Sequence, residues 1–143
     1  MIKLKIEQSS SSEQDYLGDK IVEFNAQQVP FLQSEPFIDL SYSLKTSDNF
    51  CVGGVRAFLY CWKCLYIDVL WLEEKYRHLG YGAKLIKKVE DDAIKQGCRL
   101  VHLDTFDFQA KDFYLKQGYE IFGELEDCPP GHKRIYLRKY FKD

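Results

Sequence analysis

The 143-residue sequence has no run of lysine and arginine, and its 20 basic residues stand against 22 acidic ones, for a net charge of −2. A nucleic-acid-binding protein usually has a basic bias or a basic stripe, so we expect no nucleic-acid partner. Long hydrophobic runs are also missing. The longest, Cys64–Leu72, has nine residues and contains Asp68, whereas a membrane-spanning helix needs about 20. We therefore expect no membrane segment.

The N-terminus lacks the apolar run of a signal peptide, because Ile2, Leu4 and Ile6 alternate there with charged residues. The five cysteines are an odd number, which does not suggest a framework of disulfides. Together these features predict a cytoplasmic protein with reduced thiols.

Cys61 and Cys64 form a C-x-x-C motif. In a thiol redox protein this motif lies at the start of a helix, where the thiolate is stabilised, but here it spans a predicted hairpin turn. A zinc site would need a second pair of ligands at suitable spacing, which the sequence lacks. We therefore expect neither redox chemistry nor a metal.

Hydrophobic residues make up 45% of the chain and aromatic residues 15%, which excludes global disorder. The length corresponds to a single domain, residues 1–143. Alternating apolar residues predict strands over residues 2–7, 37–45, 51–60, 64–72, 99–105, 119–125 and 133–141, and helical spacing predicts helices over residues 12–28, 80–96 and 109–117. The order β-α-β-β-β-α-β-α-β-β indicates a layered α/β fold with a sheet of mixed direction.

The first predicted helix has Ser11 as its N-cap, and Gln14 would complete a capping box with it. The side of this helix that we expect to be buried carries Leu17, Ile21, Val22 and Phe24.

The most informative segment is residues 70–83, in which an apolar strand ends, a short polar loop follows, and Gly80 and Gly82 open a long helix. The first backbone N–H groups of a helix are unpaired and lie at its positive end. Glycine lets a bulky anion approach these groups closely, and the planar guanidinium of Arg77 suits phosphate oxygens. The segment therefore predicts a cradle for a diphosphate.

The two glycines also have other interpretations. They could merely shape the start of the helix. A dinucleotide-binding fingerprint would need a third glycine where the chain has Leu85, and the Gly-Lys-Ser/Thr of a P-loop is found nowhere in the sequence.

The spacing of Arg77, Gly80 and Gly82 resembles the Arg/Gln-x-x-Gly-x-Gly/Ala signature of the GNAT superfamily of acyl-CoA-dependent N-acyltransferases. A second motif of that family, Ala-x-x-x-Tyr-x-Lys-x-Gly-Phe/Tyr, is matched downstream by Ala110, Tyr114, Lys116, Gly118 and Tyr119. The resemblance extends from about Cys51 to Phe122 and departs from the family at Asp107, where Asn is common. It implies a mixed, mostly antiparallel central sheet with helices on both faces.

The resemblance also implies acetyl-CoA as cosubstrate. Its pyrophosphate would lie on the amides of residues 77–82, and its pantetheine arm would run along the strand that ends at Leu72, whose N–H would polarise the thioester carbonyl. The cofactor-binding residues so implied are Leu70, Leu72, Arg77, His78, Leu79, Gly80, Tyr81, Gly82, Ala83 and Tyr114. Tyr114 would be the general acid for the leaving thiolate, or alternatively a core aromatic residue beside Phe113.

Acetyl transfer requires a neutral amine, so a base must accept its proton. The candidate bases are Asp68, Glu73, Glu74, Glu23 and His102. Asp68 interrupts an apolar strand, on which alternation places it on the same face as Leu70 and Leu72. The alternative for Asp68 is a carboxylate paired with a neighbouring cation, and His102 fits a structural, hydrogen-bonded histidine.

The sequence as a whole thus predicts an acetyltransferase that acts on the primary amine of a small molecule, by direct attack in a ternary complex. The rival interpretations are a CoA-binding sensor or scaffold without turnover, and a thiol redox protein that uses Cys61 and Cys64. A homodimer is among the oligomeric states that the sequence leaves open.

Overall fold

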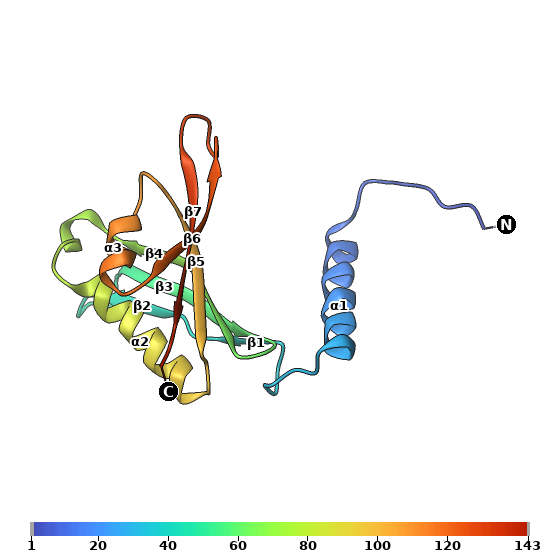
Figure 1. The fold of residues 1–143 in the computed structure, drawn as a ribbon, viewed down its shortest axis with the longest axis horizontal. Coiled ribbons are helices and arrows are strands. Elements are labelled where there is room, and N and C mark those ends of the chain that lie inside the picture. Colours follow the sequence, from blue (N-terminus) through green and yellow to red (C-terminus); the bar gives the residue numbers. More distant parts are fainter. Residues whose placement is uncertain (1, 143) are drawn as a thin grey trace.

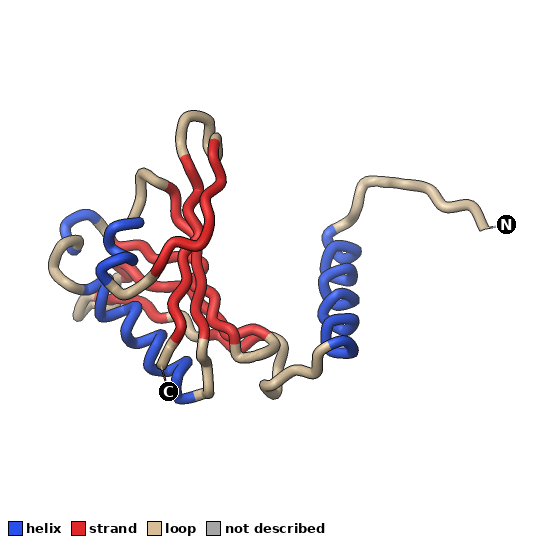
Figure 2. Tube along the Cα trace, viewed as in Figure 1, coloured by secondary structure: helices blue, strands red, loops and turns tan. Residues whose placement is uncertain are grey.

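The computed structural model describes residues 2–142 and contains a twisted sheet, two helices packed on it and one helix that stands apart (Figures 1 and 2). The elements in chain order are α1 (Ser11–Gln28), β1 (Phe37–Asp39), β2 (Tyr42–Lys45), β3 (Cys51–Tyr60), β4 (Cys64–Leu72), the 3-10 turn η1 (Glu74–Tyr76), α2 (Tyr81–Lys95), β5 (Leu100–Phe106), α3 (Lys111–Lys116), β6 (Glu120–Glu126) and β7 (Lys133–Tyr140).

The sheet has the strand order β1-β3-β4-β5-β7-β6, and β2 also pairs with β3. Among the strand pairs of the described chain, β4 and β5 alone run parallel, and the other neighbours are antiparallel. The predicted mixed, mostly antiparallel sheet is therefore confirmed.

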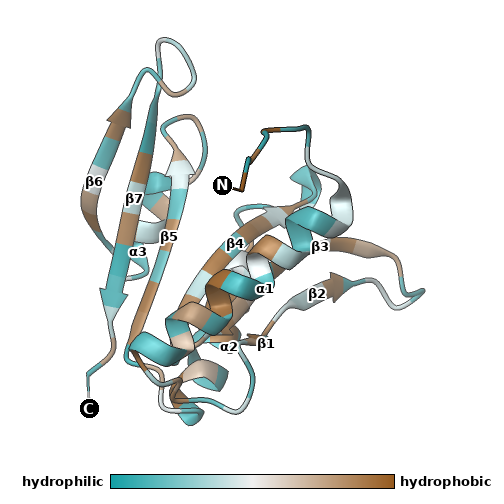
Figure 3. Ribbon diagram, turned by 90° about the vertical axis from the view of Figure 1, so that its right-hand side faces the viewer, coloured by the Kyte–Doolittle hydropathy of each residue, from teal (hydrophilic) through white to brown (hydrophobic). Residues whose placement is uncertain are grey.

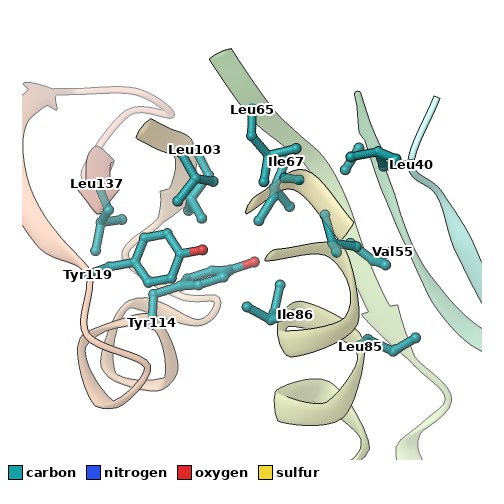
Figure 4. Close-up of a cluster of buried hydrophobic side chains, with 14 of the residues drawn as sticks. Leu40, Val55, Leu65, Ile67, Leu85, Ile86, Leu103, Tyr114, Tyr119 and Leu137 are labelled. Atoms are coloured by element: carbon teal, nitrogen blue, oxygen red, sulfur yellow. The ribbon is translucent and has the colours of Figure 1, made fainter. Parts of the chain in front are cut away.

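One face of the sheet is covered by α2 and α3 and forms the core (Figures 1 and 4). The side of α2 that carries Leu85, Ile86 and Val89 is buried against this face, as the helical spacing predicted. Gly97 follows α2 with a φ of +93°, a conformation that glycine adopts without strain at the end of a helix.

The opposite face of the sheet carries aromatic side chains that are only partly buried. Phe58, Tyr60 and Tyr66 contact one another edge-on or tilted, and the His102 ring lies 5.2 Å from that of Tyr66. We call this surface the open face, because α2 and α3 lie on the other side of the sheet (Figure 1).

The first helix differs from the expectation in its packing. A capping box of Ser10 and Glu13 starts α1 one residue earlier than predicted. None of the 18 residues of α1, all of which the structure describes, is buried, so the prediction that Leu17, Ile21, Val22 and Phe24 face a core is wrong. The helix lies on the side of the open face but stands away from it (Figures 1 and 3).

Two predicted strands are also corrected. Residues 2–9 are extended but pair with no strand of the described chain, so the half-buried strand expected at Ile2, Leu4 and Ile6 does not form, and these side chains are 87% or more exposed. The single strand expected over residues 37–45 is split into β1 and β2. Leu40 N still donates to Ala57 O at 2.9 Å, but Ala57 N donates to the Ser41 hydroxyl instead of a backbone carbonyl, which interrupts the ladder.

A buried ionic cluster joins α2 to strand β7 and to the end of α3. The Glu90 carboxylate accepts hydrogen bonds from Tyr119 Oη at 2.7 Å and from Lys139 Nζ at 3.2 Å. Lys139 also donates to the carbonyl oxygen of Gln117 at 2.9 Å. The cluster therefore ties the end of α3 and strand β7 to α2, and it satisfies a carboxylate that is 8% exposed.

Replacing Lys139 by methionine should lower the free energy of unfolding by about 3 kcal/mol, because it leaves the buried Glu90 carboxylate without its cation. Urea denaturation would measure the change. The matched control is Lys87→Met, which removes the exposed pair with Asp91 and should cost less than about 0.5 kcal/mol. Equal losses in the two variants would contradict the assignment.

Candidate functional site

The site begins where β4 parts from β5. Their parallel pairing covers residues 64–67 of β4 and residues 100–103 of β5 and then stops. At the same point β4 has a bulge, since Ala57 pairs with Ile67 and Arg56 with Val69, which leaves Asp68 as an extra residue. A bulge bends its strand and increases the local twist, so the last part of β4 diverges from the neighbouring strand.

The divergent part of β4 has free backbone groups on its outer edge. Glu73 N donates to Val52 O at 2.8 Å, which makes Leu72 opposite Gly53 a non-hydrogen-bonded pair of the β3–β4 ladder. The N–H and C=O groups of Leu72, and those of Leu70 two residues earlier, therefore point away from β3. Beyond Ile67 no described strand pairs with this edge, as the predicted role of Leu70 and Leu72 requires.

The segment that follows β4 presents a second set of free amides. Within residues 2–142, the N–H groups of residues 78–83 make no hydrogen bond. His78 and Gly80 have φ values of +62° and +91°. Left-handed turn backbone at a helix start is a conformation in which successive amides can converge on an anion, and we call residues 78–83 the amide cup. Leu79 is exposed beside them, and Tyr81 and Ala83 are partly buried as the helix begins.

Side chains hold this cup on the end of β4. Arg77 Nε donates to Leu72 O at 2.8 Å, while the guanidinium remains exposed. Gly82 is buried, and a Cβ there would lie 3.3 Å from the ring of Phe113 on α3. Gly82 thus serves the packing of the helix start, which is one interpretation of the glycines. This role is compatible with the other interpretation, the predicted diphosphate cradle.

A cavity of about 300 Å³ lies in the gap between the diverging strands. Its lining comes from β4, β5, the following loop, α3 and β7, and includes Tyr66, Asp68, Leu70, Asp104, Thr105, Phe106, Gln109, Ala110, Tyr114 and Arg134. Because Tyr114 lies on the core side of the sheet and Tyr66 on the open face, the cavity passes through the sheet.

Tyr114 reaches the cavity from the short helix α3. The residue is 5% exposed, and its ring packs on Phe113 and Tyr119. Its hydroxyl points toward the β4 side of the core, where Ile67 lies (Figure 4). Burial, with the nearby Asp104 carboxylate, raises the pKa of Tyr114 to about 12, so the phenol is protonated at neutral pH and able to donate.

The structure places the candidate bases in different surroundings. Asp68 lines the cavity and accepts hydrogen bonds from Arg56 Nε at 2.8 Å and from Arg56 Nη2, which fits the alternative of a paired carboxylate. The bulge reverses the alternation, so Asp68 lies with Arg56 on the open face while Leu70 and Leu72 pack on the core side. The expectation that the three share a face is wrong.

The remaining candidate bases do not line the cavity. The Nε2 atom of His102 lies 2.7 Å from Tyr60 Oη, and burial lowers the pKa of this histidine, in keeping with its structural interpretation. Glu73 and Glu74 are exposed in the loop after β4, and Glu23 lies on α1, 3.2 Å from Lys20.

The pair formed by Asp104 and Arg134 was missed from the sequence. Asp104 accepts from Arg134 Nη2 at 2.7 Å and from Tyr66 Oη at 2.9 Å, at the mouth of the cavity on the open face. The alternation of polar and apolar residues along β5, with Asp104 two positions after His102, is the signal that could have placed it there.

Asp107 has a structural partner. It accepts hydrogen bonds from His132 Nδ1 at 2.9 Å and Lys133 N at 3.0 Å, so it anchors the β6–β7 hairpin loop. A second hollow, of about 440 Å³, lies beside residues 138–142. Its charged side chains are engaged elsewhere, Arg138 with Glu120 and Lys139 with Glu90.

The thiols of Cys61 and Cys64 are free and flank the β3–β4 turn. Burial raises the pKa of both, so neither is an activated nucleophile. Among residues 2–142, no three His, Cys, Asp or Glu side chains are grouped so that they could hold a metal ion. No helix in that range is both long and apolar enough to cross a bilayer.

Comparison with known proteins identifies relatives of the chain. Residues 7–119 match the model of the acetyltransferase (GNAT) family. An acetyltransferase from Agrobacterium fabrum is 31% identical over 72% of this chain and 74% of its own. Blasticidin-S acetyltransferase from Streptomyces morookaense is 38% identical over 49% of this chain. This match spans 52% of the Streptomyces protein, about half of its length.

Solved structures share the fold. A crystal structure of an acetyltransferase from Bacillus cereus is 35% identical, covers 96% of this chain and 98% of its own, and has a TM-score of 0.84. A streptothricin acetyltransferase from Bacillus anthracis, solved in complex with acetyl coenzyme A, is 23% identical, covers 76% of this chain and 65% of its own, and has a TM-score of 0.65.

Gly80→Ala should weaken CoA binding at least about tenfold, because a Cβ disfavours the positive φ that shapes the amide cup. The matched control is Gly131→Ala in the β6–β7 hairpin loop, where φ is +82° and a Cβ also meets no atom within 4 Å. Both variants should lose about 1 kcal/mol of stability. Isothermal titration with CoA would separate them, and equal affinities would contradict the cup.

Proposed function

The chain belongs to the GNAT family of acetyltransferases, and we propose that it transfers the acetyl group of acetyl-CoA to the primary amine of a small molecule. The observation that carries the proposal is the juxtaposition of three features at one gap in the sheet: the free edge of β4, the amide cup after it and the Tyr114 hydroxyl. The first two suit the cosubstrate, and the third suits its leaving group.

The residues present fit acetyl-CoA. The amides of residues 78–83 would hold the pyrophosphate, with Arg77 beside them, and the outward-pointing N–H and C=O groups of Leu70 would bind the amides of the pantetheine arm. The Leu72 carbonyl oxygen already accepts a hydrogen bond from Arg77 Nε, so Leu72 would offer its N–H alone. The thioester would then lie in the gap. There the Leu72 N–H would stabilise the negative charge that develops on the carbonyl oxygen.

Transfer forms a C–N bond and breaks the C–S bond of the thioester. In the proposed reaction the amine nitrogen attacks the carbonyl carbon directly. The buried Cys61 and the partly buried Cys64 lie at the opposite end of β4 from Leu72, so neither provides a covalent intermediate. The sulfur leaves as a thiolate, and Tyr114 donates its phenolic proton to it. The proton that the nitrogen loses as the amide forms returns Tyr114 to the phenol. The attacking ammonium must first lose a proton, for which Asp68, at the cavity wall, is the proposed acceptor, directly or through water.

The acceptor would enter from the open face. The mouth of the cavity there combines the rings of Tyr66 and Phe106 with the Asp104 carboxylate, which is paired with Arg134. Aromatic rings can contact an organic cation through their faces. Relatives named for blasticidin S and for thialysine support a small amine as the substrate class. A cytoplasmic setting, where acetyl-CoA is available, would suit this reaction.

A panel of small primary amines, incubated with acetyl-CoA and the full chain, tests the proposal directly. Mass spectrometry of the products should show an acetylated amine formed in proportion to enzyme. Saturable binding of CoA without transfer to any amine of the panel would instead favour the CoA-binding sensor or scaffold.

Tyr114→Phe should lower kcat by about 100-fold, the usual contribution of a general acid, and should leave the dissociation constant of CoA nearly unchanged. The pH profile adds a sharper criterion. Since the pKa of Tyr114 is raised to about 12, the phenol stays protonated through pH 10, and the wild-type rate should not fall between pH 7 and pH 10. An unchanged kcat in the variant would exclude Tyr114 as the acid.

Asp68→Asn should lower kcat/KM for the amine by about 10-fold or more, with the largest loss at low pH, where the amine is protonated. The matched variant is Arg56→Gln, which removes the partner of Asp68 but keeps the carboxylate. It should retain most of the activity if Asp68 accepts the proton. Steady-state kinetics between pH 6 and pH 9 would show whether the two variants separate, and equal losses would assign the pair a structural role.

A further inference from the structure

The chain exposes far more surface than a compact monomer of its size. Its accessible surface is 10440 Å². Folded monomers follow a surface–mass relation that gives roughly 7,700 Å² for this chain, so the excess is about 2,700 Å². In a standard protein–protein interface each partner buries only about 800 Å². The excess is therefore large enough for a stable interface.

α1 contributes to this exposure, because none of its residues is buried. Leu17, Ile21 and Phe24 follow one another at helical spacings of four and three residues, so they form one apolar side of α1. These side chains are 53–61% exposed. An isolated helix of this length is only marginally stable in water, and this one needs a surface on which to pack.

The open face has the complementary property. It presents the rings of Phe58, Tyr60 and Tyr66 across two neighbouring strands, and α2 and α3 cover the other side of the sheet (Figure 1). The chain thus contains an apolar helix side without a partner and an aromatic sheet face without a cover.

The connection between them holds α1 away from its own sheet. Trp62 Nε1 donates to Val29 O at 2.9 Å, and Leu32 N donates to Cys61 O at 3.0 Å. Gln33 bonds Leu59 O and Lys63 N on the β3–β4 hairpin. The linker is therefore fixed to the β3–β4 hairpin, and α1 stands away from the sheet (Figure 1).

A relative supports this position of the helix. The Bacillus cereus acetyltransferase aligns with 96% of this chain at a TM-score of 0.84. An alignment of that extent can omit only about six residues, far fewer than the first 28, so the aligned part includes most of the α1 segment.

We propose that two copies of this chain exchange their N-terminal helices, so that α1 of each copy packs its Leu17–Ile21–Phe24 side on the open face of the other. A second copy is the occupant that supplies both missing surfaces at once and in equal number. The two contacts are identical and close on themselves, as in a twofold dimer.

The exchange would also complete the acceptor site, a consequence that rests on the proposed function. The cavity opens on the open face at Tyr66, Asp104 and Arg134. A helix lying across that face would form the missing wall of the cavity and exclude water from the amine. The active unit would then be the dimer.

Sedimentation equilibrium of the full chain tests the exchange without reference to activity. The wild type should sediment at twice the chain mass of 16.9 kDa. Ile21→Glu should weaken dimerisation by roughly 100-fold, because it places a carboxylate in each of two identical apolar contacts. The matched control is Ala26→Glu, on the same helix but turned by about 140°, which should leave the dimer intact.

Mixing two variants distinguishes exchange from packing within one chain. Ile21→Glu damages the helix side and Phe58→Glu the receiving face, so each alone should be monomeric. In a mixture, a heterodimer retains one unaltered helix on one unaltered face, and dimer should reappear. Circular dichroism checks that Phe58→Glu folds, and Tyr60→Glu replaces it if it does not.

Three results would overturn the proposal: a monomeric wild type at high micromolar concentration, a dimer unaffected by Ile21→Glu, or a mixture that stays monomeric. In the activity assay, Ile21→Glu should lower kcat/KM for the amine while CoA affinity is unchanged, and Ala26→Glu should not. If the wild type transfers no acetyl group, the sedimentation results still decide the exchange.

Discussion

The divergence of β4 from β5 is the constraint on which the rest of the site depends. Two parallel strands would ordinarily continue their ladder, and here the extra residue Asp68 bends β4 away after Ile67. Buried or half-buried backbone groups need partners, and the outward groups of Leu70 and the N–H of Leu72 find none in the sheet. This edge of β4 therefore suits an extended ligand with amide groups, and the pantetheine arm of acetyl-CoA is the ligand that we propose for it.

The gap that this divergence opens is lined from both faces of the sheet, the core side and the open face. On the core side, α3 places the Tyr114 hydroxyl at the gap, and the buried Glu90 cluster fixes the end of that helix through Gln117 and Tyr119. On the open face, the gap ends among aromatic and paired charged groups. In the proposed reaction, the cosubstrate would lie along β4, the amine would enter from the open face, and the reacting atoms would meet between the strands.

Much of this could be predicted from the sequence. The period of apolar residues located α2 and most strands to within a few residues, and Arg77, Gly80 and Gly82 identified the helix start, because local spacing is enough to specify a helix terminus. Tyr114 followed from its motif. These are short-range features, which one segment of the chain encodes on its own.

The features that the sequence analysis missed or placed wrongly depend on contacts between segments that are far apart in the sequence. The bulge at Asp68 arises from the pairing of β4 with β3, so simple alternation assigned Asp68 to the wrong face. The Asp104–Arg134 pair joins β5 to β7 and leaves no local motif. The apolar side of α1 was predicted to face the core of its own chain and is exposed instead, because helical spacing identifies an apolar side but not the surface that covers it.

The most direct measurement of the central claim is amide hydrogen exchange by nuclear magnetic resonance, with and without acetyl-CoA. The account predicts that the N–H groups of Leu70 and Leu72 and of residues 78–83 exchange rapidly in the free protein and become strongly protected when acetyl-CoA is added. Exchange at these amides that stays unchanged while acetyl-CoA saturates the protein would contradict it.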